Sequence, residues 1–168
     1  TGLLMTDCTF PIKPLMYGGT GSASAQAEQP DFLPDRLESG TPNIIGAASM
    51  GAGLSFLGKR GTQMIFDHEQ HLCDLFIKGL SGVPEITIYR KEKPSYVPIV
   101  SFNIENSAPE ETAEYLNREG FCLRAGLHCA PLAHKYNGTP EGTVRFAPSI
   151  FNSDREVIFL VQTLKKYV

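Results

Sequence analysis

Apolar residues recur with a helical period in three stretches of this 168-residue chain. Residues 62–78 place one apolar stripe on a single face, and Gly79 and Gly82 follow where such a helix would end. Residues 109–119 begin with acidic side chains and are followed by Gly120, as expected for a second helix. A capping box, Ser153-Asp-Arg-Glu156, predicts the start of a final helix. Its inward face would carry Val157, Leu160, Val161 and Leu164.

Shorter segments alternate as β-strands do. Residues 86–89, 98–104 and 143–147 have this pattern, and residues 121–124 predict a fourth short strand. Residues 2–6 predict a buried strand that needs a sheet to join. From residue 41 onward helices alternate with short strands, which is typical of an α/β or α+β domain.

The first forty residues contain a long stretch with neither period. Prolines and glycines interrupt residues 7–40, so we expect an irregular arm, and long arms of this kind are often functional or face a partner. Thr41-Pro42 then predicts a helix start, with Thr41 as N-cap and Pro42 at the first helical position. This helix would reach about Leu57 and stop at Gly58. The uncharged run 41–58 is too short and too rich in small residues for a membrane span, so we predict a buried helix.

Composition places the chain among ordinary globular proteins. Hydrophobic residues make up 42% and charged residues 20%, and the net charge is −3. These values give no electrostatic reason to expect nucleic acid or a membrane surface as a partner. The four cysteines form no CxxC pair and no zinc-type spacing, and no secretory signal is evident. We therefore expect reduced thiols, no metal site and a cytoplasmic protein.

The segment Arg-Ala-Gly-Leu-His-Cys-Ala-Pro, residues 124–131, carries the strongest chemical signal. A thiol is nucleophilic only as thiolate, and cationic neighbours on a partly exposed loop favour that form. The neighbours of Cys129 are Gly126, His128, Pro131 and the nearby Arg124 rather than periodic apolar residues, so we predict a reactive thiol. His128 beside it could orient the thiol or move protons. The other cysteines, Cys8, Cys73 and Cys122, are interpreted as inert core residues.

Two further groups could bind anions. Arg145 interrupts an apolar strand, so its guanidinium must meet either a structural carboxylate or an anionic ligand, and Arg124 has the same alternatives. Thr41 at a helix start combines a hydroxyl with free backbone N–H groups, which suits a phosphate. The loop Gly18-Gly19-Thr20-Gly21 would let backbone approach a ligand closely.

Taken in order, these motifs resemble a known family. Gly-Gly-Thr-Gly (18–21), Glu-Ser-Gly-Thr-Pro-Asn (38–43), the segment around Cys129, and Val-Arg-Phe-Ala-Pro (144–148) followed by Phe151-Asn152 resemble the C-terminal part of class V aminotransferases. Within that family the chain is most similar to the SufS-like branch of cysteine desulfurases and selenocysteine lyases. The resemblance covers nearly the whole chain.

The resemblance implies a fold and a cofactor. Such proteins are pyridoxal 5′-phosphate enzymes of fold type I that act as homodimers, with the active site shared between subunits. Residues 1–40 would then form the C-terminal end of the large cofactor domain, a strand followed by a glycine- and proline-rich active-site arm. Residues 41–168 would form the C-terminal small domain, a short and mostly antiparallel sheet with helices packed on it. A small amino acid would be the substrate, and a sulfur-acceptor protein a possible partner.

It also implies residue roles. Cys129, with His128 beside it, matches the cysteine that attacks the substrate sulfur and becomes a persulfide. Arg145 matches the arginine that binds the substrate carboxylate, with Arg124 in support. Thr41 matches the threonine that reaches the cofactor phosphate of the other subunit, and Gly18, Gly19, Thr20 and Gly21 match the adjacent glycine loop.

The chain departs from the family pattern at two places. No His-Lys pair precedes the segment 1–6, where the family carries its Schiff-base lysine, so we expect a C-terminal portion that is inactive alone. Leu127 stands where many SufS-like members have a histidine. Two alternatives therefore stay open: a class V aminotransferase or selenocysteine lyase with another substrate, and a non-catalytic sulfur-carrier or interaction domain.

Overall fold

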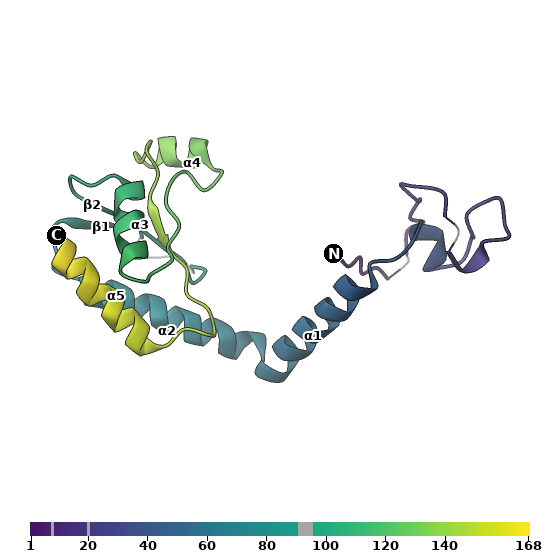
Figure 1. The fold of residues 1–168 in the computed structure, drawn as a ribbon, viewed down its shortest axis with the longest axis horizontal. Helices are drawn as coiled ribbons and strands as arrows, with labels where there is room; N and C mark the ends of the chain where they lie inside the picture. Colours follow the sequence, from purple (N-terminus) through teal and green to yellow (C-terminus); the bar gives the residue numbers. More distant parts are fainter. Residues whose placement is uncertain (8, 20, 91–95) are drawn as a thin grey trace. The chain divides into compact units, whose positions relative to one another are not determined.

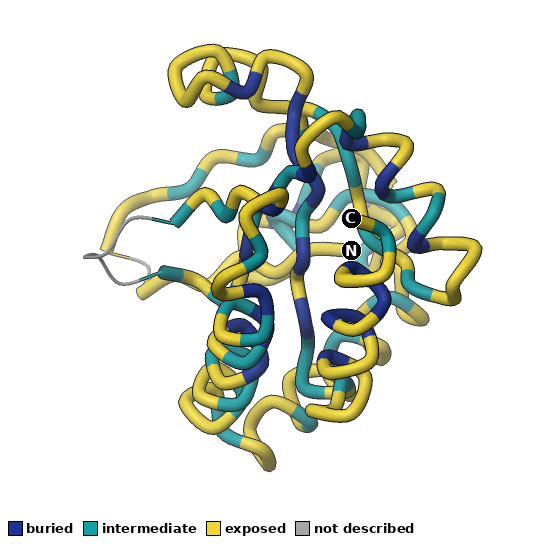
Figure 2. Tube along the Cα trace, turned by 90° about the vertical axis from the view of Figure 1, so that its left-hand side faces the viewer, coloured by how far each residue is buried: buried dark blue, intermediate teal, exposed yellow. Residues whose placement is uncertain are grey.

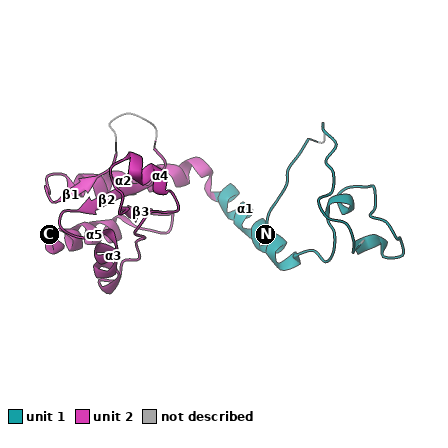
Figure 3. Cartoon of the chain, turned by 90° about the horizontal axis from the view of Figure 1, so that it is seen from above, with its two compact units in different colours: residues 1–59 teal, residues 60–168 magenta. Residues whose placement is uncertain are grey.

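The computed structural model describes residues 1–7, 9–19, 21–90 and 96–168. The chain forms two compact units, residues 1–59 and residues 60–168 (Figure 3). The boundary expected after residue 40 concerns the full-length protein and stays a prediction.

Residues 60–168 are built on a three-stranded antiparallel sheet (Figure 1). Its strands are β1 (Ile86–Ile88), β2 (Val100–Ile104) and β3 (Val144–Phe146), in the spatial order β1-β2-β3. Ile86 pairs with Ile104, and Val100 pairs with Phe146. This short antiparallel sheet with packed helices confirms the predicted fold class.

Three helices of this unit supply the core. They are α2 (Thr62–Leu80), α3 (Pro109–Arg118) and α5 (Asp154–Tyr167). α2 and α5 lie side by side, and α3 packs on β2 and β3. The predicted capping box at the start of α5 is confirmed: the backbone N–H of Ser153 donates to Glu156 Oε2 at 2.7 Å, and the N–H of Glu156 donates to Ser153 Oγ at 3.4 Å.

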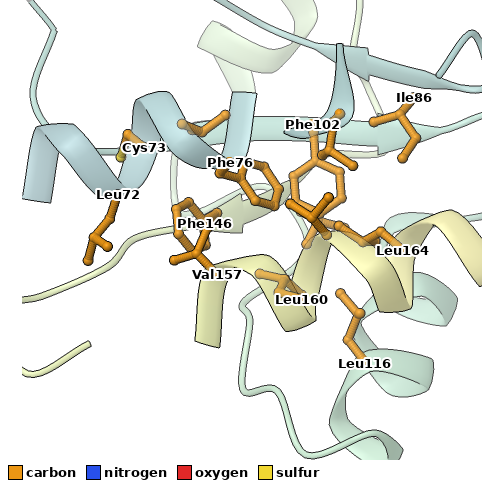
Figure 4. Packing of buried hydrophobic residues seen from close by; sticks show 14 of the residues in the cluster. Leu72, Cys73, Phe76, Ile86, Phe102, Leu116, Phe146, Val157, Leu160 and Leu164 are labelled. Carbon is orange, nitrogen blue, oxygen red and sulfur yellow. The ribbon is translucent and has the colours of Figure 1, made fainter. Parts of the chain in front are cut away.

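The core lies between these helices and one face of the sheet. β2 alternates buried and half-buried residues, so only one of its faces reaches the core. Phe76 of α2 stacks on Phe146 at 4.4 Å between ring centroids and lies 5.4 Å from Phe102 (Figure 4). The buried hydrophobic residues of the described part all lie in this unit, and its fully buried side chains include Leu72, Phe76, Phe102, Leu116, Val144 and Leu164. Figure 2 shows buried and exposed stretches alternating along the chain.

Residues 1–59 contain little regular structure. They comprise two 3₁₀ turns, Gly21–Ala23 and Asp35–Leu37, followed by helix α1 (Ile44–Arg60), whose last residue belongs to the other unit. The strand predicted over residues 2–6 is wrong: these residues form no strand, and Leu3 and Met5 are 67% and 89% exposed. A strand needs a neighbour to bond its N–H and C=O groups, and no described segment provides one here.

Helix α1 also differs from expectation in three respects. Asn43 rather than Thr41 caps it, because Asn43 Oδ1 accepts the N–H of Gly46 at 2.9 Å. It continues through Gly58 to Arg60. None of the residues of α1 is buried, so the predicted buried helix is wrong within this unit. The other described residues of the unit form only 3₁₀ turns and irregular backbone, which provide no apolar core for the helix to pack on. No helix in the described ranges is long and apolar enough to cross a membrane.

Candidate active site

Arg124 and Arg145 lie directly opposite each other. The expected strand at 121–124 reduces to a single antiparallel bridge between these two residues, in which the N–H of Arg145 donates to the carbonyl oxygen of Arg124 at 2.8 Å. Directly opposed residues project from the same face of a sheet. Because Val144 and Phe146 on either side of Arg145 point into the core, both guanidinium groups project from the other face.

Neither arginine has a carboxylate partner within the described ranges, where the ion pairs are His71–Asp154, Arg90–Asp74 and Arg118–Glu114. Like charges directly opposite each other are unfavourable unless something compensates them. Both arginines are also among the residues lining a cavity of about 570 Å³ on the side of α5, which includes the acidic residues Glu119 and Glu156. The structure shows no ion pair for Arg145 within the described ranges, so an anionic ligand stays the prediction for this residue.

Cys129 occupies an exposed turn of unusual backbone geometry. His128 and Cys129 have φ angles of 49° and 61°, in the left-handed region that residues other than glycine seldom adopt. The N–H of Ala130 closes this turn by donating to the carbonyl oxygen of Leu127 at 2.8 Å. Such backbone strain clusters at functional sites, where surrounding contacts hold it in place. A short helix that the sequence did not predict, α4 (Pro131–Tyr136), follows immediately.

The turn is anchored on the segment that leads into β3. Gly126 and Thr143 exchange backbone hydrogen bonds of 3.1 and 3.2 Å. Nε2 of His128 lies 3.0 Å from the carbonyl oxygen of Thr143, so the ring nitrogen must carry the proton and donate. Arg145 is two residues beyond Thr143. The same strand thus holds the cysteine turn and carries the guanidinium.

The surroundings of His128 favour the neutral form of its ring. Burial lowers the pKa of the ring, and the charges of Arg145, His134 and Arg124 lower it further, against the opposing effect of the hydrogen bond to Thr143. Nδ1 of His128 is buried and has no hydrogen-bond partner among the described residues. A neutral ring with a free lone pair can accept a proton from a nearby group.

The remaining cysteines differ in exposure. Cys73 is fully buried in α2, and burial raises the pKa of its thiol to about 11, which agrees with the predicted inert core residue. Cys122 is exposed, so its assignment to the core is wrong. The segment 121–124 forms only the bridge at Arg124, and Cys122 faces the cavity that both arginines line. Cys8 lies outside the described residues.

The candidate phosphate site lies within residues 1–59. The N–H of Gly40 donates to the carbonyl oxygen of Gly19 at 2.9 Å, which places the glycine loop next to the residue before Thr41. A Cβ on Gly19 would stand 2.8 Å from Cα of Gly40, so only glycine permits this approach. Thr41 is exposed, and Gly18 and Gly21 have positive φ angles. Thr20 lies outside the described residues.

The site residues therefore fall into separate groups. Arg124, Arg145, His128 and Cys129 are linked through β3, although Cys129 is not among the residues lining the arginine cavity, so a pocket shared by the thiol and the guanidinium stays a prediction. No cluster of three metal-binding side chains occurs in the described part. Sequence reasoning missed Thr143, whose backbone binds Gly126 and the ring of His128. The glycines at positions 126 and 142, which have positive φ in the structure, were the available signal.

Comparison with known proteins gives the family. The model of the aminotransferase class-V family matches residues 3–160, which is nearly the whole chain. The chain belongs to this family. Among class-V relatives, a protein of Methanothermobacter thermautotrophicus named probable cysteine desulfurase is 33% identical over 99% of the chain. A cysteine desulfurase of Synechococcus elongatus is 31% identical over 96% of the chain.

Solved structures agree with the fold. The apo structure of a cysteine desulfurase from Thermococcus onnurineus superposes with a TM-score of 0.81 over 93% of the chain, at 31% identity. The chain spans 43% of the Methanothermobacter protein, 25% of the Synechococcus protein and 39% of the Thermococcus chain. It thus corresponds to less than half the length of these relatives.

Proposed function

We propose that this chain is the C-terminal part of a pyridoxal-phosphate-dependent cysteine desulfurase that takes sulfur from L-cysteine as a persulfide on Cys129. The observation that carries the proposal is the opposition of Arg124 and Arg145 on one face of the sheet, with no ion pair to either guanidinium in the described ranges. Two guanidinium groups in this arrangement suit the carboxylate of an amino acid. The relatives named as cysteine desulfurases support the same substrate class.

The exposed turn at Cys129 supports the second half of the proposal. The thiolate of Cys129 attacks the substrate sulfur, an S–S bond forms, and the Cβ–S bond of the substrate breaks. The electron pair of that bond stays with carbon and takes a proton, so that L-alanine leaves and the persulfide stays on the protein. We assign His128, which precedes Cys129 and whose Nδ1 has no hydrogen-bond partner among the described residues, as the group that receives the thiol proton.

The cofactor would be held partly by residues 1–59. Thr41 and the backbone at Gly18, Gly19 and Gly21 fit a phosphate, because the contact of Gly19 with Gly40 keeps side chains out and the exposed Thr41 hydroxyl lies next to it. Pyridoxal phosphate, when bound, supplies the electron sink that C–S cleavage requires. The shared use of this site by two subunits of a homodimer belongs to the same proposal.

A single substitution tests the proposal in the full-length protein. Cys129→Ser should abolish persulfide formation while the cofactor absorbance persists, because the serine oxygen cannot carry sulfane sulfur. Cys122→Ser tests the other exposed cysteine, which lies seven residues away and lines the cavity with both arginines; persulfide formation should persist in it. Full sulfur release by Cys129→Ser, or its loss in Cys122→Ser alone, would refute the assignment.

A further inference from the structure

The turn that carries Cys129 is tied to the helix that follows it. His134 of α4 donates its backbone N–H to the carbonyl oxygen of Ala130 at 3.2 Å, directly after the bond that closes the turn at Ala130. The position of α4 therefore determines how Cys129 is presented. α4 is only six residues long and has no buried residue, so apolar packing does not fix it.

Two bonds to Thr139 hold α4 instead: the backbone N–H of Thr139 donates to the carbonyl oxygen of His134 at 2.9 Å, and a side-chain bond joins the same two residues. Nδ1 of His134 lies 2.9 Å from Oγ1 of Thr139, which is 5% exposed. Because Thr139 Oγ1 itself donates to the carbonyl oxygen of His134 at 3.4 Å, the Nδ1–H of His134 is the donor in this pair. Thr139 also accepts the N–H of Gly142 at 2.9 Å. The bond thus joins α4 to the loop that enters β3.

The same histidine reaches the residue next to the thiol. The rings of His134 and His128 lie 5.9 Å apart between centroids, at an angle of 42°. His128 is bound to Thr143 through its Nε2, and Thr143 lines a cavity of about 210 Å³ together with His134 and Thr139. His134 therefore contacts both ends of the arrangement, the strand loop and the cysteine turn.

We propose that His134 is a positioning residue for Cys129: its bond to Thr139 fixes α4 and thereby holds the His128–Cys129 turn in its left-handed conformation. The proposal rests on the proposed function, because it assigns a purpose to the position of the Cys129 thiol. His134 itself does not touch the substrate in this assignment. Its effect passes through the backbone at Ala130 and through the ring of His128.

The test compares four variants of the full chain. His134→Leu and Thr139→Val remove the bond, whereas His134→Asn and Thr139→Ser keep an amide donor or a hydroxyl acceptor at the same place. We expect hydrogen exchange of the Ala130 amide to become roughly tenfold faster in the first two variants and to stay near that of the wild type in the second two. Amides of α5, such as that of Leu164, report whether the fold itself is intact.

A kinetic measurement on the full-length holoenzyme completes the test. We expect the rate of persulfide formation on Cys129 to fall roughly tenfold in His134→Leu and Thr139→Val with KM for L-cysteine unchanged, because carboxylate binding by Arg145 does not depend on α4. His134→Asn should restore the rate. If both bond-removing variants keep Ala130 protection and rate, or if only His134→Leu has an effect, the proposal is overturned. Absence of persulfide in the wild type would instead refute the proposed function, while the exchange measurement still judges the positioning.

Discussion

Gly142 packs its backbone directly against Gly126. A Cβ atom at position 142 would stand 2.7 Å from Cα of Gly126, and Gly142 has a φ of +95°. The contact lies beside the paired hydrogen bonds that join Gly126 to Thr143, so it sets the distance between the cysteine turn and β3.

Substitution of Gly142 should consequently disturb both stability and the site. We expect Gly142→Ala to lower the free energy of unfolding by about 2–5 kcal/mol, the sum of left-handed strain and steric overlap with backbone that cannot move easily. Urea denaturation measures this loss. Gly138→Ala is the matched control, because Gly138 also has a positive φ of 73° but nothing within 4 Å of the added Cβ, and it should cost only about 1–2 kcal/mol. Equal losses in the two variants would contradict the role of close approach.

The opposed arginines should matter for binding and little for folding. We expect Arg145→Gln to raise KM for L-cysteine roughly 10- to 100-fold in the full-length enzyme, since a charge-assisted bond to the carboxylate is lost. Its free energy of unfolding should stay within about 0.5 kcal/mol of the wild type or rise, because the repulsion from Arg124 is relieved. Steady-state kinetics and urea denaturation give both values. Arg155→Gln on the exposed side of α5 should change neither; a strongly destabilised Arg145→Gln would point to a structural role.

Stability should depend on pH through His128. The pKa of this ring is lowered in the folded chain from its ordinary value of 6.5, so the unfolded chain binds more protons at mildly acidic pH. The neutral His128 ring therefore contributes to the free energy of unfolding above about pH 6.5, and this contribution is lost as the pH falls below that value. His128→Gln keeps an N–H donor for Thr143 but does not titrate. We expect the wild type to lose more stability than this variant between about pH 7.5 and pH 5 in urea denaturation. Parallel curves would show that His128 is not held neutral.

The cysteines should separate by accessibility. Iodoacetamide at about pH 8 should modify Cys122 and Cys129 within minutes, because both are exposed. Cys73 should stay unmodified, since it is fully buried and the pKa of its thiol is raised to about 11. Peptide mass mapping of the native chain distinguishes the three sites, and the same reaction in denaturant is the control in which all become modified. Labelling of Cys73 in the folded chain would show that α2 opens readily.

The sequence by itself determined most of the elements of residues 60–168. The apolar stripe of α2, the capping box of α5 and the alternation of the three strands are local patterns, and the structure follows them to within a few residues. Local patterns suffice there because each element buries its own apolar face against the others. The exposed position of Cys129 also follows from the composition of its neighbours.

Tertiary structure decided the rest. The bridge between Arg124 and Arg145 and the contact of Gly142 with Gly126 join segments that are far apart along the chain, so no local pattern specifies them. Helix α4 has no buried apolar face and is held by backbone and side-chain bonds between His134 and Thr139, so no apolar period in the sequence indicates it. The segment 2–6 shows the converse: a strand-like sequence remains exposed coil where no neighbouring strand pairs with it.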